Sequence, residues 1–389
     1  MSLYNKRGVS AQKEEVHAAT KHLDQGLFPT AFCKIYPDYL GGDASMINVM
    51  HADGAGTKSI LAYLYWKETG DISVWNGIAQ DAIVMNLDDL LCVGIYNNIV
   101  FNSTIDRNKH LITGEVLSQI INASQNLFDT LKTFGVEIHY LGGETADVGD
   151  VVRTVAVNGT MTCRWQKDKV ISNDKIKPGD VIVGLASFGQ ATYEKEYNSG
   201  IGSNGLTSAR HDVLSKYYAE NFKEGYAPEL NDDFVYIGKY RLTDTVLVNG
   251  QTIEIGKLIL SPTRTYAPVL KNLLENHFDK IHGLIHCSGG GQTKCMKYLP
   301  GDFKVIKDNL FEAPEIFSII KESSGSNNRE MYEVFNMGCR LEIYCNKEDA
   351  EVMIEAAKSF NIEAQIIGRV EESVKKELII KLKDEEIVY

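Results

Sequence analysis

The chain has 389 residues, a formal net charge of −12 at pH 7, 44% hydrophobic residues and 24% charged residues, a composition typical of a folded protein large enough for two domains. It contains no long basic run, so no nucleic-acid surface is expected, and a phosphate ligand would need local cations, a metal or backbone amides. No apolar run approaches the roughly 20 residues of a membrane span. The start, MSLYNKRGVSAQKEE, lacks the apolar core of a signal peptide, so we expect a cytoplasmic protein with no membrane partner.

The first half of the chain interleaves apolar runs with helical patterns. Apolar runs lie at Met46–Met50 and Ile95–Phe101, and Val151–Cys163 is predicted to be a strand because it is rich in β-branched residues. Apolar residues three and four apart predict helices over Asp81–Cys92 and Gly114–Phe134. A Pro-Gly-Asp turn follows at 178–180, so we place a boundary near residue 175 and predict domains at 1–175 and 176–389.

The second half repeats this mixed pattern, and we therefore predict two α+β domains of similar size. Helices are predicted at Leu206–Glu220, Thr265–Asn276 and Asp349–Phe360, and strands at Val181–Ala186, Gly283–Cys287, Cys339–Cys345 and Ala364–Val370.

The first segment with chemical potential follows the apolar run at 46–50. Asp53 can hold a hard cation, Gly54 and Gly56 let backbone amides approach an anion, and Thr57 and Lys58 complete the segment with a hydroxyl and a point charge for phosphate. The spacing before the lysine is too short for a Walker A loop. The alternative is an ordinary turn between a strand and a helix.

A second group lies on the helix predicted over 81–92. Asp81, Asn86 and Asp89 accompany an otherwise apolar sequence, and Asp81 and Asp88 share one face of the helix. Carboxylates beside an apolar face are costly unless they pair or bind metal, and magnesium nucleotides need a few hard oxygen ligands. The alternative is a solvated acidic stripe.

The third group is a glycine-rich segment after the apolar residues 138–141. Gly142 and Gly143 precede Glu144 and Thr145, and we expect a loop that offers a carboxylate to metal and backbone amides to phosphate. A Gly-Gly turn carrying surface acids is the alternative.

The second domain contributes three further segments. Ser203, Asn204 and Gly205 open a predicted helix, where free amides favour an anion, although a plain helix cap is the alternative. Arg264 lies in a Pro-Thr-Arg segment that could equally be a surface turn. His286 ends a predicted strand and is followed after two residues by three consecutive glycines, which suit close approach of a phosphate or sugar; a lone histidine is otherwise more often structural. The glycines are Gly289, Gly290 and Gly291.

The order of these segments resembles one family. Asp-Gly-x-Gly-Thr-Lys, Asn-x-x-Asp-Leu, Gly-Gly-Glu-Thr-Ala, Ser-Asn-Gly, Pro-Thr-Arg, His-x-x-Gly-Gly-Gly and Glu-Met-x-x-x-Phe-Asn-x-Gly succeed one another from about residue 50 to 370. This series is similar to that of the phosphoribosylformylglycinamidine cyclo-ligases, also called aminoimidazole ribonucleotide synthetases, of the PurM-like superfamily. The start at Gly8-Val9-Ser10 resembles the family's start as well.

The resemblance implies a fold and a reaction. It implies two α+β domains, with the first pairing across a homodimer to build a barrel-like sheet, and an ATP- and Mg²⁺-dependent closure of formylglycinamidine ribonucleotide, a phosphoribosyl amidine, to aminoimidazole ribonucleotide with release of ADP and phosphate. It also implies residue roles. Asp53, Asp89 and Glu144 would hold metal and phosphate; Gly54, Gly56, Thr57, Lys58, Asp81, Asn86, Gly142, Gly143 and Thr145 would bind ATP; Ser203, Asn204, Gly205, Arg264 and Gly289 to Gly291 would bind substrate; and His286, Lys58 and Asp89 would serve catalysis.

The chain departs from the family pattern near this expected site. The glycine-rich segment before the first strand is replaced at 28–32, Asp147-Val148-Gly149 replaces Glu-Met-Pro, and Gly202 replaces the histidine before Ser-Asn-Gly. Residues Gln190 to Ile201 are an insertion, which could be a lid or a flexible surface loop. These departures concern the substrate's identity more than the fold or the use of ATP.

Two kinds of alternative follow. One is another ATP-using enzyme of the superfamily, of the selenophosphate synthetase, thiamine-monophosphate kinase or hydrogenase maturation dehydratase type. The other is a non-catalytic nucleotide-binding homologue, against which the intact carboxylates argue, because unused buried carboxylates are a liability.

Overall fold

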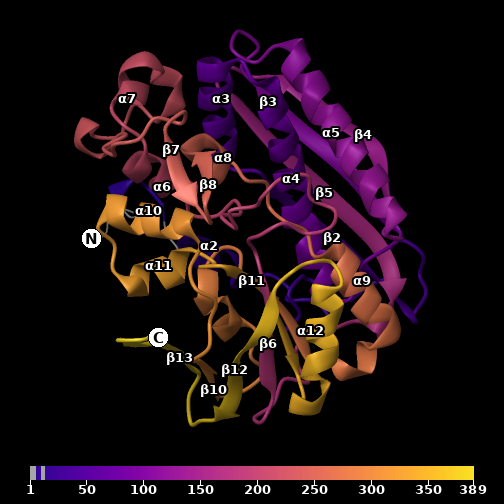
Figure 1. Ribbon diagram of the computed structural model, residues 1–389. Helices are drawn as coiled ribbons and strands as arrows, with labels where there is room; N and C mark the ends of the chain where they lie inside the picture. Colours follow the sequence, from indigo (N-terminus) through magenta and orange to yellow (C-terminus); the bar gives the residue numbers. More distant parts are fainter. Residues whose placement is uncertain (1–5, 10–13) are drawn as a thin grey trace.

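The computed structural model of the chain describes residues 6–9 and 14–389, so the predicted Gly8-Val9-Ser10 motif ends at a residue outside the described part. Residues 6–9 precede helix α2 (Glu14–Thr20), and the chain forms two large sheets, one built from each half of the sequence. Figure 1 shows the first sheet with its helices above and the second sheet below. Nowhere in residues 6–9 and 14–389 is a helix both long and apolar enough for a membrane span.

The first sheet has five strands in the order β1-β2-β5-β3-β4, with only β3 and β4 parallel. The strands are β1 (Tyr36–Pro37), β2 (Met46–Gly54), β3 (Ile99–Arg107), β4 (Ile138–Asp147) and β5 (Val155–Gln166). Side chains alternate between the two faces of each strand, as on β2, where Ile47 and Val49 are buried and Met50 is 75% exposed. Among the described residues no further strand pairs with β1 or β4, so the sheet is open at both of these edges.

Helices α4 (Trp75–Leu91) and α5 (Gly114–Thr133) cover one face of this sheet (Figure 1). Helix α5 begins where the Thr113 side chain accepts a hydrogen bond from the amide of Val116. Nearly every residue of α4 is buried, because the sheet, α5 and the second domain surround it. It starts six residues before the predicted helix, and α3 (Lys58–Thr69) was not predicted. A helix that is buried on all sides lacks the polar stripe that marks its length in a sequence.

The second sheet has seven strands in the order β14-β13-β10-β12-β6-β11-β9. The strands are β6 (Val181–Ala186), β9 (Gly283–His286), β10 (Phe303–Lys307), β11 (Cys339–Cys345), β12 (Ala364–Glu372), β13 (Glu377–Lys381) and β14 (Glu386–Val388). The central strands β6 and β11 are buried along their whole length. Helices α9 (Ala267–Asn276) and α12 (Ala350–Lys358) contact each other beside β6 and β12, and the remaining elements lie at the other end of the domain. These are α6 (Leu206–Val213), α7 (Tyr217–Asn221), β7 (Thr245–Val248), β8 (Gln251–Glu254), α8 (Ile255–Ile259), α10 (Glu315–Ser324) and α11 (Asn328–Val334).

Two further predicted elements differ from the structure. The single helix predicted over 206–220 is wrong, because Leu214 adopts an extended conformation and pairs with Tyr240, which divides it into α6 and α7. The strand predicted from Val151 begins at Val155, and Val151 is 82% exposed in the preceding turn. Strand β5 ends at 166 and β6 begins at 181; the predicted boundary at 175 lies between them and stays a prediction.

Candidate active site at the domain junction

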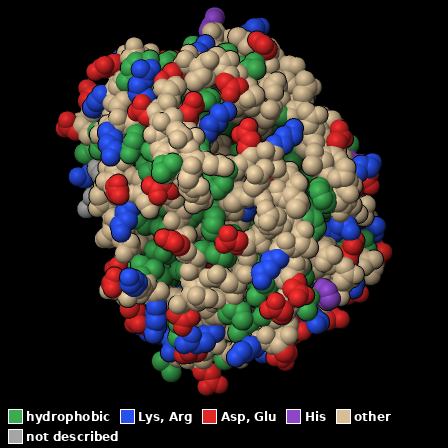
Figure 2. All heavy atoms as spheres, in the orientation of Figure 1, with side chains coloured by type: hydrophobic (Ala, Val, Ile, Leu, Met, Phe, Trp, Pro, Cys, Tyr) green, Lys and Arg blue, Asp and Glu red, His purple; other side chains and the backbone are tan. Residues whose placement is uncertain are grey.

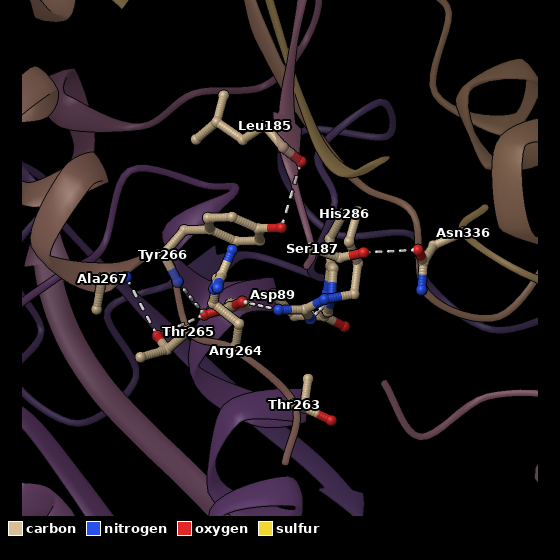
Figure 3. A network of polar contacts seen from close by, with 12 residues as sticks. Asp89, Leu185, Ser187, Thr263, Arg264, Thr265, Tyr266, Ala267, His286 and Asn336 are labelled. Carbon is tan, nitrogen blue, oxygen red and sulfur yellow. Dashed lines mark hydrogen bonds and ion pairs between the residues drawn. The ribbon is translucent and has the colours of Figure 1, made fainter. Parts of the chain in front are cut away.

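Asp89, near the C-terminal end of α4, lies at the centre of a polar network between the two domains. Its Oδ1 is 2.6 Å from Nδ1 of His286 at the end of β9, and its Oδ2 is 3.2 Å from Nε2 of His51 on β2. Burial raises the pKa of Asp89, but hydrogen bonds from His286 and His51 outweigh it and hold that pKa well below its usual value. Asp89 is therefore a carboxylate at neutral pH, and Figure 3 shows it close to His286.

Arg340 on β11 joins this network, although the sequence motifs did not identify it. Its Nη1 is 2.7 Å from Nε2 of His286, and its Nη2 is 3.3 Å from Oδ2 of Asp88. Asp88 also accepts a hydrogen bond from the hydroxyl of Thr265. The network therefore connects α4 with strands β9 and β11 of the second domain.

Asn86 fastens the same helix to the first sheet. Its side-chain amide lies 3.1 Å from the carbonyl of Asp53, 2.9 Å from that of Ala82 and 3.2 Å from that of Gly159. Its Oδ1 is 3.2 Å from Nδ1 of His51. The amide hydrogens of Asn86 are thus directed at backbone acceptors, and the predicted contact between Asn86 and nucleotide stays a prediction.

Lys58 and Asp81 form a fully buried ion pair with a 3.0 Å separation. The Lys58 ammonium also donates to the carbonyls of Gly202 at 3.1 Å and Ser261 at 2.5 Å. Burial lowers the pKa of Lys58, and Asp81 offsets part of that effect. An ammonium has three donors, and all three have acceptors here. A contact between Lys58 and phosphate stays a prediction that requires one of these bonds to be exchanged.

The loop at 261–265 completes the junction. The amide and hydroxyl of Thr263 donate to Oδ1 of Asp81 at 2.7 and 2.6 Å, and the hydroxyl of Thr265 donates to Asp88. Arg264 lies between these two threonines in the chain, but its side chain is directed at the insertion and not at Asp81 or Asp88. It is 1% exposed and makes two hydrogen bonds to Glu194, at 2.9 and 2.5 Å.

Glu194 belongs to the insertion at 190–201, which is packed into the protein. Ala191, Ser199 and Ile201 are each 1% exposed, and the base of the insertion is closed by backbone hydrogen bonds between Gly189 and Asn198. The Tyr193 ring contacts rings at the ends of α5 and α12, and its hydroxyl donates to the carbonyl of residue 265. The insertion is thus a brace anchored between the domains rather than a loose surface loop, although Thr192, Lys195 and Glu196 are exposed.

The glycine-rich segment at 142–145 lies within a strand. Strand β4 continues to Asp147, so the predicted loop is wrong; a bulge between Tyr140 and Gly143 accommodates it instead. A Cβ on Gly143 would lie 2.2 Å from the carbonyl oxygen of Ser103, so the position admits only glycine. Gly142, at φ +87°, has open space around it, and Glu144 and Thr145 are exposed.

The segment after β2 follows the same pattern of close backbone approach. Gly54 still belongs to β2, and a Cβ there would lie 2.1 Å from the side chain of Asn158. Gly56, at φ +59°, has open space beside it, and α3 starts two residues later at Lys58. The hydroxyls of Thr57 and Thr207 are 2.8 Å apart, which joins the start of α3 to α6.

Several predicted substrate residues lie together. A Cβ on Gly289 would lie 3.5 Å from the side-chain nitrogen of Asn204, and the hydroxyl of Ser203 is 2.9 Å from that of Thr263. Gly205, at φ +78°, precedes α6, and Gly291, at φ +49°, packs against the backbone carbonyls of Tyr332 in α11 and Phe335 just after it. Gly290, between Gly289 and Gly291, adopts φ +98°, and a Cβ there would meet no atom closer than 3.7 Å. Arg264 is the exception, because its guanidinium is directed into the insertion.

Comparison with protein families places the whole junction in one group. Residues 41–165 match the N-terminal domain of the AIR synthase related proteins, and residues 177–381 match the C-terminal domain of the same proteins. The chain belongs to the AIR synthase related family. Its two family domains cover every predicted site residue and most of both sheets, leaving out the edge strands β1 and β14.

Two curated relatives of similar length coverage carry the same name. The phosphoribosylformylglycinamidine cyclo-ligase of Methanococcus maripaludis strain C6 is 31% identical over 330 residues, covering 84% of this chain and 78% of the relative. That of Methanocaldococcus jannaschii is 30% identical over 327 residues, covering 84% and 79%.

Solved structures show the family fold at lower identity. The HypE–HypF complex matches with a TM-score of 0.56, 15% identity and coverage of 98% of this chain and 99% of the matched chain. Thiamine monophosphate kinase from Aquifex aeolicus matches with a TM-score of 0.53, 11% identity and 96% coverage of both chains.

In this AIR synthase related protein, the three predicted metal ligands do not surround one ion. Asp53 on β2 and Glu144 on β4 have β5 and β3 between them, which amounts to three strand spacings or roughly 14 Å. Within the described ranges, no three His, Cys, Asp or Glu side chains form a metal-binding group. Magnesium often uses only one or two carboxylates together with phosphates, so Asp53, Asp89 and Glu144 stay predictions as separate ligands.

Charged residues elsewhere on the protein do not form a competing site on the face seen in Figure 2. There, acidic and basic side chains are interspersed, without a broad basic area that could bind nucleic acid. The junction therefore remains the candidate site of this family member.

Proposed function

We propose that the chain catalyses the ATP-dependent cyclisation of formylglycinamidine ribonucleotide to aminoimidazole ribonucleotide, with release of ADP and phosphate. The observation that carries this proposal is about 30% identity to relatives of that name over 84% of the chain. The preserved series of segments at the junction, from Asp53 to Gly291, supports it. A cytoplasmic location accompanies this role.

The proposed reaction explains why an ATP site and a substrate site would meet at a domain junction. An amide oxygen is a poor leaving group, and phosphorylation by ATP makes it a good one. A nitrogen of the substrate's amidine group then attacks the activated carbon to close the ring, and phosphate and the proton of that nitrogen depart. Little covalent chemistry is left to the protein, so positioning of the substrates and neutralisation of phosphate charge supply most of the catalysis.

The residues divide between the two ligands in this proposal. The exposed strand segments of the first domain would bind the nucleotide, with Mg²⁺ neutralising its phosphates. The loops that start at Ser203 and Gly289 would bind the phosphoribosyl substrate, since their amides and glycines permit close approach. Asp89 would act at their meeting point, and His286 is its predicted catalytic partner.

We also propose that the chain forms a homodimer through the open face of the first sheet. On that face Met50 is 75% exposed, and on the edge strand β4 Leu141 is 65% exposed. A second copy would cover these side chains and complete a barrel-like sheet. Met50→Asp should convert a dimer into a monomer in analytical ultracentrifugation, whereas Val374→Asp, at a 96% exposed turn position, should not. A monomeric wild-type protein would refute the dimer.

The activity is tested by incubating the protein with Mg²⁺, ATP and formylglycinamidine ribonucleotide and measuring ADP and aminoimidazole ribonucleotide together. Equal amounts of both products are expected. ADP without the cyclised product would favour another phosphate acceptor, as in a kinase or synthetase of the superfamily. Neither product would favour a non-catalytic nucleotide-binding protein.

A further inference from the structure

Arg340 is a buried cation in direct contact with the candidate catalytic histidine. It lies on β11, which pairs with β9. The backbone carbonyl of Arg340 accepts a 2.7 Å hydrogen bond from the amide of Cys287, the residue after β9. Arg340 is 2% exposed and His286 is 0% exposed. The guanidinium Nη1 and the imidazole Nε2 are 2.7 Å apart, which is a full hydrogen bond.

This contact determines which ring nitrogen of His286 carries the hydrogen. A guanidinium has five N–H donors and no acceptor, and it stays protonated in proteins. Nε2 of His286 must therefore be the acceptor, with its lone pair directed at Arg340. The other nitrogen, Nδ1, then carries the hydrogen and donates it to Oδ1 of Asp89 at 2.6 Å.

The guanidinium is itself held from two further sides. Its Nη2 is 3.3 Å from Oδ2 of Asp88, and it lies 5.1 Å from the ring centre of Tyr266, at a distance suited to a cation–π contact. Asp88 is fixed in turn by the hydroxyl of Thr265 at 2.8 Å. Arg340 is thus a fixed group, and His286 is held between two charged partners.

We propose that Arg340 is a positioning residue that fixes His286 with its hydrogen on Nδ1 and directs it at Asp89. His286 then influences the reaction through Asp89, and its Nε2 is not a free acid or base. The arrangement of hydrogens follows from the contacts alone. Its effect on turnover rests on the proposed cyclo-ligase function.

The arrangement of hydrogens is tested on the wild-type protein by histidine-selective ¹⁵N labelling and long-range ¹H–¹⁵N correlation spectra, with the His286 signals assigned by their loss in His286→Gln. We expect a protonated Nδ1 and an unprotonated Nε2. A protonated Nε2, alone or with Nδ1, would overturn the proposal. This measurement needs no substrate, so it stands even if the proposed activity fails.

The effect on turnover is tested by a double-mutant cycle of Arg340→Met, His286→Gln and the two combined. Each single variant should lower kcat about tenfold or more with little change in KM, and the double variant should be no slower than the slower single one. If the fold losses in kcat of the two single variants multiply in the double variant, the proposal is overturned, because Arg340 would then act independently of His286. Arg340→Lys keeps the positive charge and N–H donors but not the planar guanidinium. It should fold like the wild type and recover part of kcat, and a kcat no higher than that of Arg340→Met would also contradict the proposal.

Discussion

Two parts of the candidate site use similar residues in opposite ways. At the domain junction, Lys58, Asp81 and Arg264 are buried, and their charges are paired with one another or with the insertion. On the first sheet, Glu144 and Thr145 are exposed beside the open space around Gly142. The comparison indicates that a family motif can contain both residues that hold the domains together and residues that face a ligand.

Burial explains the difference. A charge removed from water must be paired and fully hydrogen-bonded, so a buried motif residue is committed to its protein partners. An exposed carboxylate on a strand edge keeps its hydration and can exchange water for metal or phosphate. The predictions below test whether the two parts can be separated by mutation.

The largest effect is expected for Asp89, which lies at the centre of the polar network at the junction. Asp89→Asn removes the charge that His51 and His286 both contact, so turnover should fall by about 100-fold or more. The measurement is the paired assay of ADP and cyclised product. Asp129→Asn, on the exposed side of α5, is the matched control and should be unaffected. Unchanged turnover in Asp89→Asn would remove Asp89 from the site.

The buried ion pair should matter for stability more than for nucleotide binding. Lys58→Met leaves the carboxylate of Asp81 buried without its cation, which should lower the free energy of unfolding by about 3–5 kcal/mol. The double variant Lys58→Met/Asp81→Asn removes both charges and should recover much of that loss in chemical denaturation. A double variant as unstable as the single one would show that the pair's charge balance is not what stabilises the junction.

The insertion should behave as part of the core. Glu194→Gln replaces the carboxylate that faces the buried guanidinium of Arg264 with a neutral amide. The free energy of unfolding should therefore fall by about 1–3 kcal/mol. Glu196→Gln, an exposed change in the same segment, should have no measurable effect. Hydrogen exchange of residues 190–201 should be slow in the wild type. Exchange as fast as in an exposed loop would contradict the brace.

The smallest effect expected is a pH dependence from His51. Burial lowers the pKa of His51, but Asp89 raises it, and the net pKa lies above the usual value. A raised pKa in the folded state contributes stability that is fully present below about pH 6.5, the unfolded value, and is lost as pH rises through the folded value. The stability difference between wild type and His51→Gln should therefore shrink between pH 6 and pH 9. The exposed control His110→Gln should show no such trend, and a difference that grows with pH would be contrary to this assignment.

The sequence predicted the division into two α+β domains because strands such as Cys339–Cys345 and Val181–Ala186 are apolar runs with clear ends. It did not predict α3 or the full length of α4, since a helix buried on all sides shows no amphipathic pattern. The loop expected at Gly142 proved to be a strand with a bulge, because glycine suits both.

The sequence named several of the residues that meet at the junction, but neither Arg340 nor the pairings between side chains. The order of the motifs identified Asp53, Asp89, Glu144 and His286 as candidate site residues. Arg340 was missed because it lies inside an apolar strand. Its charge within that strand was the available signal, since a buried cation needs a specific partner. The partner of Arg264, Glu194, could not be predicted, because the insertion that carries it has no counterpart in the family pattern.

The division between the buried domain junction and the exposed strands of the first sheet is tested most directly by nucleotide binding. The measurement is the affinity for a non-hydrolysable Mg·ATP analogue, determined by calorimetry for Glu144→Gln and for Lys58→Met/Asp81→Asn. We expect Glu144→Gln to bind about tenfold more weakly or worse, while the double variant binds like the wild type. The reverse result, with binding lost only in the double variant, would show that Lys58 leaves its buried partners to hold phosphate and would contradict this account of the junction.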